Sequence, residues 1–128
     1  MAKVHPRLKQ AEKAAEGALG AEGKETIVAE LKGIDLTPEN PSVQLDSNFV
    51  IVTVAEDTEV TVRLRRSGLT GTEVAKLVIK PGASAIVSAG VQAEDEPGEL
   101  CNGTYVLTLQ STAKKLSKFR EATIQAAY

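Results

Sequence analysis

Few side chains in this chain have the chemistry of a catalytic nucleophile or base. Among its 128 residues, His5 is the only histidine and Cys101 the only cysteine. An activated Ser, Thr or Cys needs a base such as histidine beside it, and most zinc sites need several Cys or His ligands. We expect His5 to be a solvated residue of a polar N-terminal segment, and Cys101 to be a small buried or half-buried apolar residue. The sequence therefore predicts neither nucleophilic catalysis nor a zinc site.

Carboxylates are the remaining candidates for chemistry. The densest groups are Glu56-Asp57 and the run Glu-Asp-Glu-Pro-Gly-Glu at residues 94–99. Paired carboxylates can transfer protons, and several oxygens together can bind calcium. Both groups fall in expected turns, and the spacing within 94–99 matches no calcium motif, so we expect a solvated charged loop. Residues 68–71 lack the glycines and the lysine of a phosphate-binding loop. The sequence predicts no catalytic, cofactor-binding or metal-binding residues, and no enzyme.

Basic residues form two groups on or near expected strands. They are Arg63, Arg65 and Arg66 in the first group, and Lys114, Lys115, Lys118 and Arg120 in the second. The net charge of −2 argues against a dedicated nucleic-acid-binding protein, which usually has a basic excess. We expect both groups to lie on solvated strand faces. In a repeated assembly, the acidic run 94–99 of one copy could also meet the basic strand of another.

The composition fits one globular domain with a core of aliphatic side chains. Hydrophobic residues make up 42% of the chain, whereas aromatic residues make up 3% and tryptophan is absent. The N-terminus has no apolar stretch of the kind found in secretory signals, and no run approaches the ~18 apolar residues of a membrane-spanning helix. We therefore expect a protein made in the cytosol, or in a particle assembled there, with no membrane partner.

The first 25 residues differ in composition from the rest of the chain. Residues 6–19 are rich in the good helix formers Ala, Glu, Lys and Gln, but Gly17, Gly20 and Gly23 interrupt them. This pattern indicates a flexible arm or a short exposed helix, or else an arm that becomes ordered on a neighbouring subunit. We predict two parts, an N-terminal arm at residues 1–25 and a β-sandwich domain at residues 26–128.

From residue 26 onward the apolar residues follow the two-residue period of β-strands. The alternation is clearest at residues 58–65, where Val60, Val62 and Leu64 share one face. Other expected strands cover residues 26–31, 48–55, 72–80, 84–91 and 104–110. We expect a closing strand at 119–125, paired with the preceding strand through a hairpin, although 114–127 could instead be a helix. Roughly seven or eight short strands separated by turns are typical of a β-sandwich.

The run Asn-Gly-Thr-Tyr-Val-Leu-Thr-Leu at residues 102–109 resembles the penultimate strand of immunoglobulin-like sandwiches. In that family a tyrosine, here Tyr105, ties its strand to the preceding loop through its hydroxyl. The Pro-Gly turn within residues 79–84 is also similar to turns of bacterial and viral members. The resemblance covers residues 36–125 but lacks the buried tryptophan and the paired cysteines of antibody domains. A jelly-roll sandwich is the alternative topology.

A small β-sandwich with a terminal arm and no signal peptide is similar in kind to the decoration (cement) proteins of tailed-phage heads. That resemblance implies a non-enzymatic virion protein, assembled in the host cytoplasm, that stabilises a capsid lattice. Its partners would be the major capsid protein or neighbouring copies, as a homo-oligomer or on the lattice. No nucleic acid, small-molecule substrate or cofactor is implied. The alternatives are an immunoglobulin-like binding module from a larger surface or secreted protein, and a small enzyme that uses paired carboxylates.

Overall fold

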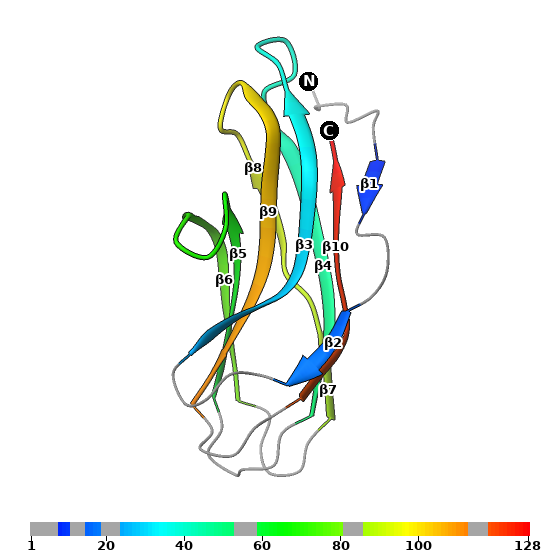
Figure 1. The fold of residues 1–128 in the computed structure, drawn as a ribbon, viewed down its shortest axis with the longest axis vertical. Helices are drawn as coiled ribbons and strands as arrows, with labels where there is room; N and C mark the ends of the chain where they lie inside the picture. Colours follow the sequence, from blue (N-terminus) through cyan, green and yellow to red (C-terminus); the bar gives the residue numbers. More distant parts are fainter. Residues whose placement is uncertain (1–7, 11–14, 19–23, 53–58, 81–85, 113–117) are drawn as a thin grey trace.

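All the regular secondary structure that the computed structural model describes is β-strand, arranged in two antiparallel sheets (Figure 1). The structure describes residues 8–10, 15–18, 24–52, 59–80, 86–112 and 118–128. None of these residues lies in a helix that is long and apolar enough to cross a membrane. The expected all-β sandwich is therefore confirmed.

Each sheet is four strands wide. In sheet A, each of the two edge positions is occupied by two short strands that follow one another along the edge. Sheet A contains β1 (Leu8–Gln10), β2 (Ala15–Ala18), β4 (Val43–Val52), β7 (Ile86–Ala89), β8 (Gln92–Asp95) and β10 (Lys118–Ala127). Sheet B contains β3 (Glu25–Leu36), β5 (Val60–Arg66), β6 (Thr72–Ile79) and β9 (Leu100–Ser111). In sheet A, β1 and β2 both pair with β10, and β7 and β8 both pair with β4.

The strand order is that of a jelly roll. It runs β1/β2-β10-β4-β7/β8 in sheet A and β3-β9-β5-β6 in sheet B, so most successive strands cross between the sheets. In an immunoglobulin fold the last two strands share a sheet, whereas here β9 and β10 lie at the centres of different sheets. The expected closing strand is confirmed, but the expected hairpin with the strand before it is wrong. The pairing is nonlocal because β10 finds its partners in β4 and in the N-terminal strands.

The N-terminal segment contributes the edge of sheet A next to β10. Leu8 lies opposite Ala127 and Ala18 opposite Lys118, so β1 and β2 follow β10 along its length. The described part of the expected arm is thus extended rather than helical, because it provides backbone partners for a strand that would otherwise be an open edge. Residues 1–7, 11–14 and 19–23 lie outside the described structure, and the division of the chain at residue 25 stays a prediction.

A break at Gly90 and Val91 separates β7 from β8 along the opposite edge of sheet A, without a shift of register against β4. The hydroxyl of Ser47 on β4 donates to the carbonyl oxygen of Val91 at 2.8 Å and accepts from the Val91 amide at 3.1 Å. A Cβ added to Gly90 would lie 2.1 Å from the carbonyl oxygen of Ser47. Glycine is therefore required here, because the two backbones approach too closely for a side chain.

Aliphatic side chains fill the space between the sheets, as the composition predicts. The inward residues of β5, which are Val60, Val62 and Leu64, are all fully buried. The strand β4 has a polar outer face at Gln44 and Asn48, and both of its faces are buried only in its second half, from Phe49 to Ile51. The strand expected at residues 48–55 therefore begins earlier, at Val43, and residues 53–55 lie outside the described structure.

Candidate functional site

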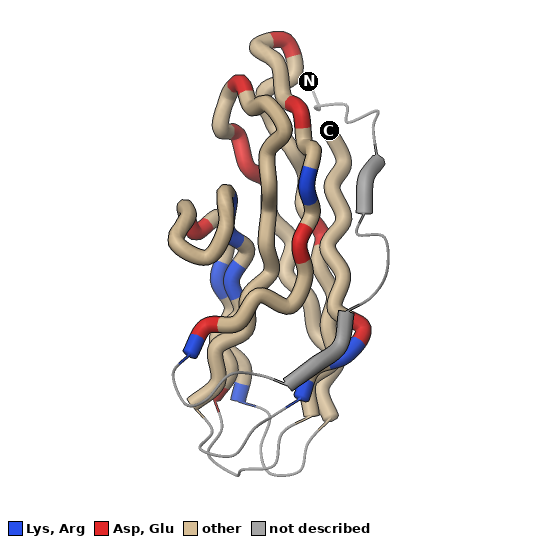
Figure 2. Tube along the Cα trace, in the orientation of Figure 1, with Lys and Arg blue, Asp and Glu red and all other residues tan. Residues whose placement is uncertain are grey.

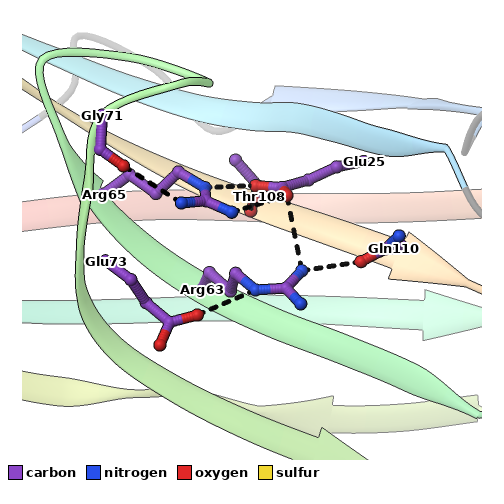
Figure 3. A network of polar contacts seen from close by, with 7 residues as sticks. All are labelled: Glu25, Arg63, Arg65, Gly71, Glu73, Thr108 and Gln110. Atoms are coloured by element: carbon purple, nitrogen blue, oxygen red, sulfur yellow. Dashed lines mark hydrogen bonds and ion pairs between the residues drawn. The ribbon is translucent and has the colours of Figure 1, made fainter.

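A network of charged and polar side chains covers the outer face of sheet B (Figure 3). The alternation of β5 turns Val62 and Leu64 toward the core, and so turns Arg63 and Arg65 outward. The strand register sets Arg63 opposite Thr108 on β9, and Glu25 on β3 opposite Gln110. These side chains come from three adjacent strands and meet over β9.

The carboxylate of Glu25 is the centre of this network. Arg65 donates to it from Nε at 2.6 Å and from Nη2 at 2.9 Å, which is the bidentate geometry of a strong ion pair. Arg63 donates to it from Nη1 at 3.4 Å, and the hydroxyl of Thr108 donates at 2.7 Å. The hydrogen bond from Arg65 is the main cause that holds the pKa of Glu25 below its ordinary value, against the opposing effect of burial.

Further contacts tie both arginines to neighbouring strands. Arg63 donates to Glu73 on β6 at 2.9 Å and to the side chain of Gln110 at 2.7 Å, and Arg65 donates to the carbonyl oxygen of Gly71 at 3.0 Å. The side chains of Arg63, Arg65 and Glu25 are only 15–18% exposed. Two positive charges here meet two negative ones, so the network is neutral. Such an arrangement fastens strands together and leaves no excess positive charge for phosphate groups.

The ion pair between Arg65 and Glu25 spans β9, and it explains why two outward residues of that strand are buried. Val106 lies opposite Arg65 and faces outward, yet Val106 and Thr108 are both 0% exposed. The aliphatic parts of the charged side chains shield them from water. The outer face of sheet B is therefore covered by paired charges over the middle of β9.

A second network joins the two sheets at Tyr105. The Tyr105 hydroxyl donates to Oδ2 of Asp95 on β8 at 2.5 Å, and Nε of Arg66 lies 3.5 Å from the same oxygen. Burial is the main cause that raises the pKa of Tyr105, and the Asp95 carboxylate raises it further. Tyr105 belongs to sheet B and Asp95 to sheet A, so this contact bridges the sandwich. The Tyr105 hydroxyl thus ties its strand to β8 of the other sheet, and not to the preceding loop as the immunoglobulin-like resemblance implies.

The structure changes the interpretation of the charged groups expected from sequence. Glu94 and Asp95 belong to β8, so the acidic loop is shorter than the predicted run 94–99. Arg66 contacts Asp95 of its own chain, and Arg63 and Arg65 have partners in their own sheet. The first basic group is therefore paired internally instead of forming a free surface. The sequence does not predict the contacts of Glu25 with Arg63 and Arg65, because Glu25 lies far from these arginines along the chain.

Of the second basic group, the structure describes only Lys118 and Arg120, which are exposed on β10. His5, Glu56, Asp57, Lys114 and Lys115 lie outside the described residues. Acidic residues gather instead at the end of the sandwich formed by the β3–β4 and β8–β9 loops (Figure 2). These loops touch where the amide of Gly98 donates to the carbonyl oxygen of Pro41.

Cys101 is exposed, so the expectation that it would be buried or half-buried is wrong. The register between β3 and β9 shifts here, because Leu36 pairs with Leu100 and Ile34 pairs with Gly103. Cys101 and Asn102 are left outside the regular ladder, and Asn102 adopts a positive φ of 52°. Within the described ranges, no three His, Cys, Asp or Glu residues lie close enough together to hold a metal ion.

Comparison with known proteins finds likeness in structure only. No protein-family description and no curated protein sequence matches the chain. A chain of the infectious bursal disease virus particle is similar with a TM-score of 0.61 and 12% identity, over 95% of this chain and 31% of that chain. The chain of the Gx strain of this virus has a TM-score of 0.58 at 12% identity, over 95% of this chain and 32% of its own length. The VP2 subviral particle gives a TM-score of 0.56 at 12% identity, with 94% and 32% covered. Our chain thus spans about a third of each of these proteins, and what it shares with them is the fold.

Proposed function

We propose that this chain is a non-enzymatic structural protein of a virus particle, and more closely a decoration (cement) protein that stabilises a capsid lattice. The observation that carries the proposal is the jelly-roll strand order, together with a likeness to virus-particle chains over nearly the whole of our chain. Because one fold serves many functions, the role itself needs support from the surface of this molecule.

The described surface favours protein contacts over chemistry. The two polar networks hold strands together, and the hydroxyl that meets the Glu25 carboxylate, that of Thr108, is fully buried. Large apolar side chains are exposed instead at Ile27, Leu69, Leu77, Val78 and Ile86. Sheet edges with unpaired backbone groups are features through which proteins assemble. The partners in this proposal are the major capsid protein or neighbouring copies, in a virion assembled in the host cytoplasm.

The N-terminal strands have a defined place in this proposal. They form the outer edge of sheet A, since β1 and β2 pair with β10 on one side only. Lattice contacts would then be made by this edge and by the adjoining sandwich surface, which includes the exposed Arg120 of β10. An immunoglobulin-like binding module has less support, because the strand order differs from that fold.

Cosedimentation of the full-length chain with capsids isolated from its own source tests the proposal. We expect the chain to pellet with the capsids and to saturate at a fixed ratio to the major capsid protein. A chain that stays in the supernatant at every concentration would refute the decoration role. Arg120→Glu, beside β2, should weaken binding. The matched charge reversal Lys32→Glu should not, because the Lys32 side chain is 72% exposed and has only a weak surface pair with Glu30. If both variants weakened capsid binding equally, the contact would not lie at the edge formed by β1, β2 and β10.

A further inference from the structure

The sandwich has four sheet edges, and three of them carry features that hinder pairing with another strand. One edge is made of the short strands β1 and β2, and a second is broken at Gly90 between β7 and β8. The third edge, β3, contains Gly33 at a φ of 79° and several register shifts against β9. Bulges and short segments of this kind are how soluble proteins protect sheet edges.

The fourth edge, β6, lacks this protection over most of its length. It is a continuous strand from Thr72 to Ile79 whose pairing with β5 shifts once, near Glu73, and is regular from Ala75 onward. It lies at the side of the molecule opposite to β1 and β10 (Figure 1). No residue of β6 is fully buried, although Val74, Ala75 and Ile79 pack against the core and Leu77 lies opposite the inward Val62. The strand therefore has an open backbone edge and an incompletely covered apolar face.

The exposure of Leu77 shows most clearly that the apolar side chains of β6 are incompletely buried. Leu77 lies opposite Val62, which is fully buried on the inner face of sheet B, so Leu77 shares that face. Even so, 37% of Leu77 is exposed, and its neighbour Val78 on the outer face is 45% exposed. An inward leucine is left this exposed because the strands of sheet A do not cover it. Another strand added beside β6 would extend the sheet and cover both side chains.

We propose that β6 pairs antiparallel with β6 of a second copy, about a two-fold axis near Leu77, so that two sheets B join into one continuous sheet. Charge favours this partner and this direction. Glu73 lies at the start of the strand and Lys80 directly after its end, so antiparallel pairing sets each acidic start beside the basic end of its mate. Parallel pairing would bring like charges together. A two-fold contact of this kind is self-complementary, because each copy uses the same strand.

The side chains of β6 suit this arrangement. Pairing centred on Leu77 sets the two leucines opposite each other and Lys76 opposite Val78 of the mate, where the aliphatic stem of the lysine can cover the exposed valine. Lys80 is available for the new contact, because its side chain is 78% exposed and its pair with Glu59 is long, at 3.9 Å. The proposed dimer does not depend on capsid binding, so it can hold or fail separately from the decoration role.

Cysteine crosslinking of the full-length chain tests the proposal. Opposite residues of an antiparallel pair have Cα atoms about 4.5–5.5 Å apart, which lies within the range of a disulfide. In a Cys101→Ser background, Leu77→Cys should therefore form a dimer on a non-reducing gel. Ile27→Cys is the matched control, because Ile27 is 40% exposed on β3, at the other edge of the same sheet. We expect Leu77→Cys to form the crosslinked dimer at least about tenfold faster than Ile27→Cys, because the dimer would keep the two introduced thiols at a high effective concentration.

Sedimentation velocity of the unmodified chain provides a second measurement that needs no variant to fold. We expect a concentration-dependent shift from monomer to dimer mass, which Leu77→Glu abolishes and Ile27→Glu leaves unchanged. Equal crosslinking of both cysteine variants would overturn the proposal, because it would indicate random collision. A chain that stays monomeric at all concentrations would also overturn it, and would leave β6 as an edge for a strand of a different protein.

Discussion

Replacing Glu25 by glutamine tests whether the charge network holds sheet B together. Four donor atoms meet the Glu25 carboxylate: Nε and Nη2 of Arg65, Nη1 of Arg63 and Oγ1 of Thr108. Glutamine keeps one acceptor oxygen but turns an NH₂ group toward a guanidinium, so about two charge-assisted hydrogen bonds are lost. Bonds of this type contribute about 1.5–3 kcal/mol each. Because the Glu25 side chain is still 15% exposed and partly screened by water, we expect a total loss of about 2–3 kcal/mol at pH 7.

The pH dependence of this loss has a defined sign. The pKa of Glu25 lies below its ordinary value of 4.5 in the folded protein, chiefly because of the hydrogen bond from Arg65. The stabilisation is therefore fully present above pH 4.5, and it disappears as the pH falls through the lower pKa of the folded state. The difference in stability between the natural chain and Glu25→Gln should be constant from neutral pH down to about pH 5 and should shrink in more acidic solution.

Urea unfolding followed by far-UV circular dichroism measures this effect, since the chain has no tryptophan. Glu30→Gln is the control on the same strand, because Glu30 is 41% exposed and its described ion pair is a surface contact with Lys32 at 3.3 Å. We expect this control to change stability by less than about 0.5 kcal/mol. The reasoning is refuted if both variants lose the same stability, or if the loss in Glu25→Gln persists undiminished at pH 3.

Three further changes test other contacts. Tyr105→Phe removes the hydroxyl that donates to Asp95 and should reduce the free energy of unfolding by about 1–3 kcal/mol in urea titrations, whereas an unchanged midpoint would contradict the bridge between the sheets. Gly90→Ala forces a Cβ against the carbonyl oxygen of Ser47 and should cost about 1–3 kcal/mol, seen as a lower melting temperature. Cys101 should react fully with a thiol reagent in the folded protein, as an exposed thiol does, and slow reaction without denaturant would show that it is covered.

The sequence predicts individual strands better than it predicts their partners. The alternation in β5 assigns Arg63 and Arg65 to the outer face, because side chains on a strand point to opposite faces in turn. It does not identify their partner Glu25, which precedes Arg65 by 40 residues and meets it only because β3 and β5 flank β9. The only available signal was a glutamate at the start of the first long strand.

Two errors in the sequence-based predictions have a common physical cause. The hairpin expected between the last two strands follows from their closeness in sequence, but their apolar faces are buried from opposite sides of the core. The possible helix at residues 6–19 follows from local propensity, whereas the described residues of this stretch pair with β10. Tertiary pairing overrides local preference in both places. The exposure of Cys101 likewise depends on a shift of register that no local pattern reveals.

The central positions of β9 and β10 determine when during synthesis the molecule can fold. Each of these strands fills the middle of a sheet, yet both leave the ribosome after the other described strands. Until β9 emerges, the strand that joins β3 to β5 in sheet B is missing. Until β10 emerges, the strand that joins β4 to the N-terminal strands in sheet A is missing. Before then, of the described pairings, only the β5–β6 hairpin and the pairing of β4 with β7 and β8 can form, and a nascent chain gains the remainder of its structure in a late, slow event. A chain truncated before β9 would lack an inner strand of both sheets.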